Sequence, residues 1–203
     1  MSNRPVRAIP ASAPDRLAIV EAFLNTLHVE RGTDALADAI GVRAWLAESQ
    51  FEVKADDLTR ADRDRLVRLR AVLRVMRGDR AAAGAVPADD FADVVGTTVL
   101  APRLGDVGQV TLTPVGSGID AIIGTLVTIV HEAQREGTWD RLKICRNERC
   151  RWAFYDESRS RTATWCAMGI CGNRAKVAAY RRKQIADRAR VAAQHRLSDD
   201  QER

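Results

Sequence analysis

Residues 144–183 read ICRNERCRWAFYDESRSRTATWCAMGICGNRAKVAAYRRK and contain all four cysteines of the chain. The cysteines form two pairs, each pair enclosing four residues, and fifteen residues separate the pairs. Two turns that each aim two thiolates inward, held together by a hairpin, supply the tetrahedral sulfur ligands that structural zinc requires. The spacing predicts one Zn²⁺ ion bound by Cys145, Cys150, Cys166 and Cys171.

The four cysteines have other readings: two disulfides, free core thiols or an iron–sulfur cluster. The residues after Met1 lack the apolar run of a secretory signal, so we expect a soluble protein of the reducing cytoplasm, where disulfides are rare. Four cysteine ligands leave no open position for water, and His28, His131 and His195 lie outside the cluster. We therefore expect the zinc to be structural and not catalytic.

The net charge of +5 conceals a division along the chain. Residues 141–196 contain 15 Lys and Arg against 4 Asp and Glu, a net charge of +11, while the remainder carries −6. A cation-rich module suits a polyanion, because each phosphate that it neutralises releases condensed counterions. Solubility alone is the other explanation, but it does not require the signs to segregate. The division therefore favours nucleic acid as a partner.

Cationic side chains of this basic part are the candidate nucleic-acid contacts. Arginines clustered on a small hairpin are expected to have no role in the core and to contact phosphates. Cations near the start of the final helix are best placed to reach base edges. Trp152 and Phe154 are expected to pack beneath the metal, with base stacking as the alternative. The candidate contacts are Arg151, Arg159, Arg161, Arg174, Lys176, Arg181, Arg182 and Lys183.

The front of the chain is predicted to be helical after a flexible leader of residues 1–14, which contains three prolines. Apolar residues recur at helical spacing, and Thr59 with Asp62 predicts a helix cap. Asn25 and Thr26 are polar residues within an apolar helix, so they either face a ligand pocket or make a capping or core hydrogen bond. The predicted helices cover residues 15–31, 34–39, 42–48, 60–77 and 91–95.

The pattern changes after residue 96. Residues 97–104 and 109–115 flank a GDVG turn and predict a β-hairpin, and residues 119–134 predict an apolar helix. That helix is interrupted by polar residues and falls short of the roughly 20 apolar residues that a membrane span needs, so no membrane association is expected. The fold class is α+β: a mainly helical N-terminal domain with a small β-hairpin, then a hairpin stapled by a four-cysteine zinc site and a basic C-terminal helix.

The residues of the metal segment resemble a known family. Cys145, then CRWAFYDES from Cys150, WCAM from Trp165 and CGNRAK from Cys171 are similar to the CGNR-type zinc finger. FLNT from Phe23, with Asp34, Leu36 and the Trp45-Leu46 pair, resembles the ABATE domain of bacterial stress-induced transcription regulators.

The resemblance implies an ABATE-like regulatory or sensor domain at 15–140 and a CGNR-type finger at 141–183. The remaining residues, 184–203, are expected to form the end of the basic helix and, beyond His195, a disordered tail. The resemblance also implies DNA binding with zinc as the metal, and a small-molecule effector for the front domain. The alternative is an RNA- or protein-binding module in which the finger is only a structural staple. A reader of palindromic sites would be a homodimer. No enzyme is expected, because the front half has no cysteine, histidine cluster or glycine-rich phosphate loop.

Overall fold

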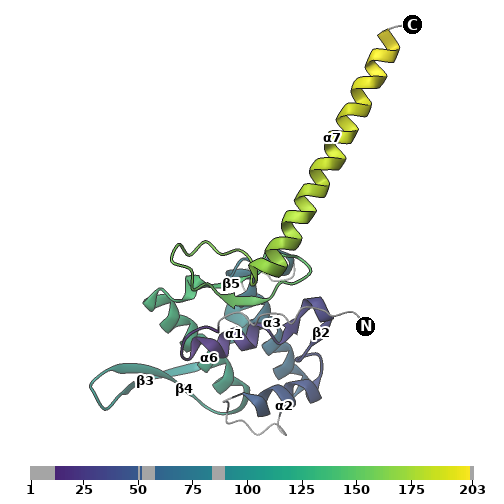
Figure 1. Cartoon of the computed structure of the whole chain (residues 1–203). Helices are drawn as coiled ribbons and strands as arrows, with labels where there is room; N and C mark the ends of the chain where they lie inside the picture. Colours follow the sequence, from purple (N-terminus) through teal and green to yellow (C-terminus); the bar gives the residue numbers. More distant parts are fainter. Residues whose placement is uncertain (1–11, 50, 52–57, 84–89, 202–203) are drawn as a thin grey trace, which may run out of the picture. The chain divides into compact units, whose positions relative to one another are not determined.

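The computed structural model describes residues 12–49, 51, 58–83 and 90–201 (Figure 1). The chain divides into two compact units, one formed by Ile9–Cys166 and the other containing Ala167–Arg203. The described strands form three two-stranded antiparallel sheets, and helices make up most of the remaining regular structure. The predicted α+β class is confirmed.

Three helices supply most of the core of the larger unit: α1 (Leu17–Leu24), α3 (Arg60–Met76) and α6 (Gly118–Glu136) (Figure 1). Each helix buries apolar residues three or four positions apart, so one face of each is removed from water. The predicted capping box of α3 is confirmed, because the Thr59 hydroxyl accepts from the amide of Asp62 and the Asp62 carboxylate accepts from the amide of Thr59. The fully buried core residues of these helices include Val20, Phe23, Leu24, Leu66, Leu69, Leu73, Ile122, Ile123 and Leu126.

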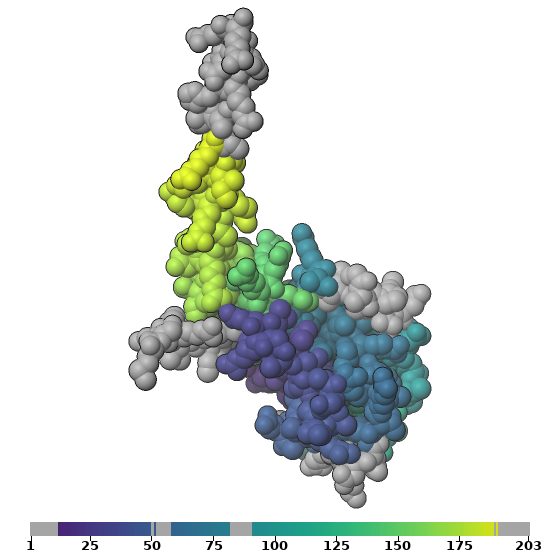
Figure 2. Space-filling model, turned by 90° about the vertical axis from the view of Figure 1, so that its right-hand side faces the viewer, coloured from purple at the N-terminus to yellow at the C-terminus, as the bar shows by residue number. Residues whose placement is uncertain are grey.

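Shorter helices complete this part of the unit. They are α2 (Ala39–Glu48), α4 (Arg80–Ala83) and α5 (Asp90–Val95). In α2, Leu46 is buried, and the Trp45 ring lies against Phe23 with the ring centroids 5.5 Å apart. On the face shown in Figure 2, the surface of the larger unit is formed mainly by segments from the first half of the chain, coloured purple to blue.

The first predicted helix is shorter than the sequence suggested. It ends at Leu24, and the chain continues through strand β1 (Leu27–His28), the 3₁₀ turn η1 (Val29–Arg31) and strand β2 (Thr33–Asp34). The Thr26 hydroxyl donates to the carbonyl of Phe23 at 2.7 Å and helps to end the helix. The predicted helix at 34–39 is wrong: Asp34 lies in β2, residues 35–38 form a turn, and α2 begins only at Ala39.

The predicted flexible leader lies mainly outside the described residues, but its last part is ordered. Ala13 is buried, and its amide donates to the Glu21 carboxylate at 2.6 Å. Residues 12–14 therefore belong to the packed unit.

The predicted β-hairpin is confirmed as β3 (Val99–Leu104) paired with β4 (Val110–Val115). The pairing places three residues of each strand on one entirely apolar face. The pair nearest the body, Leu100 and Pro114, is half-buried, and Pro114 lies so close to α6 that a Cβ on Gly124 would be 2.9 Å from it. The outer part of the hairpin is exposed. The six residues of that face are Leu100, Pro102, Leu104, Val110, Leu112 and Pro114.

The metal-binding hairpin belongs to the larger unit. After the short turn η3 (Trp139–Arg141), strand β5 (Leu142–Ile144) pairs with β6 (Ala153–Tyr155). Both strands contribute residues to the same hydrophobic core as α1, α3 and α6, namely Leu142, Ile144 and Ala153. The expected boundary between 140 and 141 is thus a boundary between sequence motifs, whereas the compact units divide after Cys166.

The C-terminal unit consists of a π-helical turn, η4 (Met168–Gly172), followed by the long helix α7 (Asn173–Gln201). The helix starts at Asn173, as the CGNR sequence predicts. It continues to Gln201, so the expected disordered tail after His195 is wrong as far as that residue.

Within the described part of the chain, no helix combines the length and the apolar content needed to cross a bilayer.

Candidate metal centre and nucleic-acid interface

The cysteines lie at the ends of short elements. Cys145 directly follows β5, and its amide donates to the carbonyl of Trp152 at 2.9 Å, which extends the β5–β6 pairing by one step. Cys150 closes the intervening turn, with its amide donating to the carbonyl of Asn147 at 2.7 Å. Cys171 lies within η4, where its amide donates to the carbonyl of Ala167. Tight turns therefore position the thiols.

The four thiols form one cluster that fits a zinc ion. All four cysteines are buried and free of disulfides, and their Sγ atoms lie within 4.8 Å of one another. Four sulfurs at the corners of a zinc tetrahedron, each about 2.3 Å from the metal, would be about 3.8 Å apart. The distance between Cys150 Sγ and Cys166 Sγ, from the two different pairs, is 3.6 Å. The predicted structural Zn²⁺ site of Cys145, Cys150, Cys166 and Cys171 is confirmed by this arrangement.

The clustering also affects protonation. The hydrogen bond with Cys150 raises the pKa of the Cys145 thiol to about 12, and the hydrogen bonds with Cys145 and Cys150 raise the pKa of Cys166. Four thiolates this close repel one another unless a cation lies between them. A bound Zn²⁺ supplies that cation and keeps the ligands deprotonated.

Asp156 fixes the loop that leads from β6 to the third cysteine. Its buried carboxylate accepts hydrogen bonds from Lys143 Nζ at 2.6 Å and from the amides of Ser158 and Ala163, each at 2.9 Å. Burial alone would raise the pKa of Asp156, but these hydrogen bonds outweigh it and hold the pKa well below its usual range. The Asp156 carboxylate therefore ties Lys143, Ser158 and Ala163 together around the loop.

Arg151 has a structural role that its hairpin position did not suggest. Its guanidinium donates two hydrogen bonds, each 2.9 Å long, to the buried carboxylate of Asp79, which Arg74 also contacts at 2.8 Å. Arg74 in turn donates to the carbonyls of Leu24 and Arg151. The expectation that Arg151 has no core role is therefore wrong: it ties the metal hairpin to α3 and α1.

Asn25 and Thr26 likewise have structural partners. The Asn25 side chain donates to the carbonyl of Ala153 at 3.0 Å and accepts from its amide at 2.8 Å, so it pairs with β6 as a neighbouring strand would. Thr26 accepts a hydrogen bond from Arg70, whose guanidinium also holds Asp34. Of the two readings of the sequence, the core hydrogen bond is the observed one, and the ligand-pocket reading is wrong.

The other candidate nucleic-acid contacts lie at the surface. Arg159 and Arg161 are exposed on the loop after β6, and the candidates on α7 are exposed on the C-terminal unit. Phe154 is buried, and Trp152 is half-buried with its ring 5.1 Å from that of His28. Both rings are therefore packed within the fold, and their position beneath the metal stays a prediction. The exposed candidates on α7 are Arg174, Lys176, Arg181, Arg182 and Lys183.

Several residues that shape this region carry no clear signal in the sequence. Asp79 follows a glycine in an ordinary helix-ending turn, and only its burial between Arg74 and Arg151 reveals its role. Lys143 looks like one more basic residue, yet it is the partner of Asp156. The Asp79–Arg151 and Lys143–Asp156 pairs join residues 72 and 13 positions apart, so periodicity cannot find them.

Comparison with protein families agrees with the geometry. Residues 17–123, more than half of the chain, match the ABATE family, described as "Putative stress-induced transcription regulator", and residues 141–184 match the CGNR zinc finger. Among curated proteins, no sequence matches this chain. The chain therefore belongs to the ABATE family and carries a CGNR zinc finger at its C-terminal side.

Proposed function

We propose that this protein is a transcription regulator that binds duplex DNA through its zinc finger and the adjoining helix α7. The observation that carries the proposal is the segregation of charge. Between residues 174 and 190, α7 contains seven Lys and Arg against one Asp, and all seven cationic side chains are exposed. A helix of this charge attracts the phosphate backbone, which supplies much of the affinity in protein–DNA complexes.

The roles of individual cations follow from their positions. Arg174 and Lys176 lie in the first turn of α7, three and five residues after the metal ligand Cys171, and are the best placed for base edges. Arg181, Arg182 and Lys183, further along the helix, are assigned to phosphates, as are Arg159 and Arg161 on the loop. Arg151 is left out of this set, because Asp79 already engages its guanidinium.

Fluorescence anisotropy with a labelled random duplex at two salt concentrations tests the proposal. Replacing Arg181, Arg182 and Lys183 with Gln should weaken binding and reduce the slope of log K against log salt by up to about 3, because each lost phosphate contact contributes about 0.9 to that slope. The matched control replaces three exposed arginines of the larger unit with Gln: Arg31, Arg60 and Arg103. The absence of duplex binding by the zinc-loaded wild type at low salt would disprove the proposal.

Single-stranded RNA is the second candidate ligand. Tyr180 is 63% exposed on α7, directly before Arg181 and Arg182, and an exposed aromatic ring among cations suits base stacking on a single strand. Competition between single-stranded RNA and the duplex separates the two candidates. Stronger competition by RNA, lost in Tyr180→Ala, would favour the RNA-binding role.

The remaining features of the proposal concern setting and assembly. We place the protein in the cytoplasm, because four zinc-binding thiols require a reducing environment. We assign it no enzymatic activity, since the metal-ligating cluster found among the described residues is saturated by its own four cysteines. Binding to palindromic sites would require a homodimer, and sedimentation of the zinc-loaded protein with and without duplex measures that directly.

A further inference from the structure

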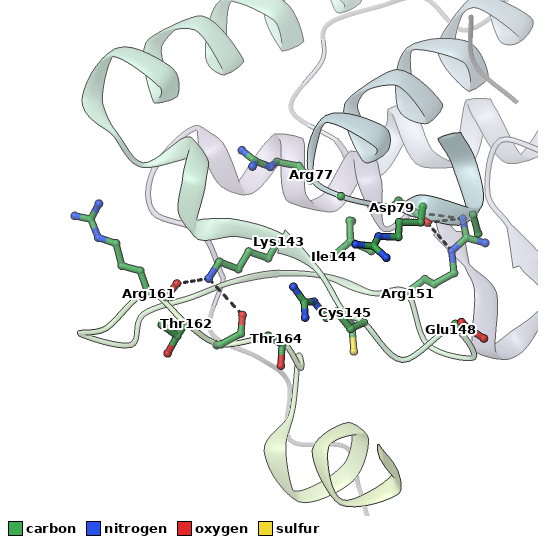
Figure 3. Close-up of a pocket in the computed structure, with 15 residues that line it drawn as sticks. Arg77, Asp79, Lys143, Ile144, Cys145, Glu148, Arg151, Arg161, Thr162 and Thr164 are labelled. Atoms are coloured by element: carbon green, nitrogen blue, oxygen red, sulfur yellow. Dashed lines mark hydrogen bonds and ion pairs between the residues drawn. The ribbon is translucent and has the colours of Figure 1, made fainter. Parts of the chain in front are cut away.

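A cavity of about 870 Å³ lies within the larger unit, beside the metal hairpin. One wall is the turn between α3 and α4, residues 77–81, and the others are β5 with the first cysteine turn and the loop segment 161–164. Figure 3 shows Arg77 and Asp79 on the α3 side of β5, and Thr162 and Thr164 on its other side. The volume lies within the roughly 300–1,000 Å³ typical of small-molecule sites.

The lining of the cavity is strongly cationic, with six Lys or Arg and two carboxylates, Asp79 and Glu148. Three of the cations are already paired within the fold: Arg77 with Asp140, Lys143 with Asp156, and Arg151 with Asp79. Asp79 is shared by Arg151 and Arg74, so its charge is more than balanced. The paired groups therefore leave no net negative charge in the walls.

The other three cations have no carboxylate partner within 4 Å among the residues that the structure describes. They are Arg80, Arg146 and Arg161, which come from three different segments of the lining and are all exposed. Glu148, also exposed, is the one remaining carboxylate of the lining. A concave surface with an excess of cations concentrates the positive electrostatic potential and therefore attracts a multivalent anion.

The walls are held in place before any ligand arrives. Lys143 Nζ donates to the carbonyls of Arg161 and Ala163 (Figure 3). It also donates to the Asp156 carboxylate, and together these bonds fix the loop segment against β5. The two hydrogen bonds between Arg151 and Asp79 fix the α3–α4 turn against the metal hairpin. Fixed walls reduce the entropy that binding must overcome.

We propose that this cavity binds a small anion that carries phosphate groups. Guanidinium groups present a planar fork of donors that matches phosphate oxygens, and Arg80, Arg146 and Arg161 each have their fork available within the described fold. The concave shape and limited volume of the cavity favour a compact molecule over the long backbone of a duplex. Because Ile144 and Cys145 line the cavity, the ligand lies against the metal hairpin and stabilises it.

Isothermal titration of the full-length, zinc-loaded chain with fructose 1,6-bisphosphate tests the proposal, with unphosphorylated fructose as the reference. The expected result is saturable binding of one bisphosphate per chain and none of fructose. Replacing Arg80 and Arg146 together with Gln should raise Kd at least tenfold. The matched control, Arg31→Gln with Arg103→Gln, should stay within twofold, and zinc content and circular dichroism confirm that each variant is folded.

The proposal is overturned if the bisphosphate does not bind saturably, or binds equally well after the Arg80 and Arg146 replacements. The proposal does not depend on DNA binding, although Arg161 belongs both to the cavity and to the proposed DNA surface. A duplex-binding arm therefore separates the two sites through residues that they do not share. The triple replacement of Arg181, Arg182 and Lys183 should lose the duplex and keep the bisphosphate. If the Arg80 and Arg146 replacements weaken the duplex while the bisphosphate does not bind, the cavity is part of the DNA surface and the small-ligand proposal is wrong.

Discussion

At the residue scale, Asp156 is the charged group on which the metal loop depends most. Its carboxylate is 1% exposed and accepts three hydrogen bonds. Replacing it with Asn removes the charge that pairs with Lys143 and turns one acceptor into a donor. We expect a loss of about 2–3 kcal/mol in the free energy of unfolding, measured by urea denaturation of the zinc-loaded protein at pH 7. Asp106→Asn, on the exposed hairpin turn, is the control and should change little.

The depressed pKa of Asp156 gives this effect a pH dependence. The ionised carboxylate favours the folded state, so its contribution is fully present above the unfolded pKa of about 4 and disappears as pH falls through the lower folded pKa. The stability gap between wild type and Asp156→Asn should therefore stay constant from pH 8 to about pH 5 and narrow in more acid solution. Comparing the two proteins at each pH cancels the zinc loss that they share. A gap that widens in acid would contradict this assignment.

Asp79 is the second residue whose charge is buried between partners. Removing the charge, as in Asp79→Asn, leaves Arg74 and Arg151 facing each other without an anion, and we expect a loss of about 3–5 kcal/mol. A double-mutant cycle with Arg151→Gln should give a coupling energy above about 1 kcal/mol. If the losses in unfolding free energy of the two substitutions are additive, the Asp79–Arg151 ion pair does not contribute to stability.

At the scale of elements, the Asn25 side chain links the end of α1 to β6. Asn25 makes two hydrogen bonds to the backbone of Ala153, which lies 128 residues away. Asn25→Ala should cost about 1–3 kcal/mol because it leaves the Ala153 amide and carbonyl without these partners. Hydrogen exchange should report faster exchange of the Ala153 amide. Unchanged protection there would mean that water or a shifted strand replaces Asn25 without cost.

At the scale of the whole molecule, the metal site and the front helices share one core. Leu142, Ile144 and Ala153 from the metal hairpin pack in the same cluster as Leu66 and Leu73 of α3. Removing zinc with a chelator should therefore speed hydrogen exchange in α3 as well as in β5 and β6, and lower Tm for the larger unit as a whole. If the finger folded independently, zinc removal would speed hydrogen exchange in β5 and β6 and leave exchange in α3 unchanged.

The features that could be predicted from the sequence are the local ones. The spacing of the four cysteines, the Thr59–Asp62 cap, the β3–β4 hairpin and the start of α7 each depend on residues a few positions apart, or on a metal with a fixed ligand geometry, and the structure confirms them. The charge division is likewise a property of composition along the chain.

The pairing of distant residues became visible only in the folded chain. In the folded chain Asn25 pairs with Ala153, and Arg151 pairs with Asp79, which is 72 positions away. Because α1 ends at Leu24, Asp34 lies in a strand and forms an ion pair with Arg70. Folding also placed three arginines from separate segments around one cavity. The physical reason is the same in each case. These hydrogen bonds and ion pairs form between groups that the packing of the core brings together, and the local periodicity of a sequence does not determine which distant groups become neighbours.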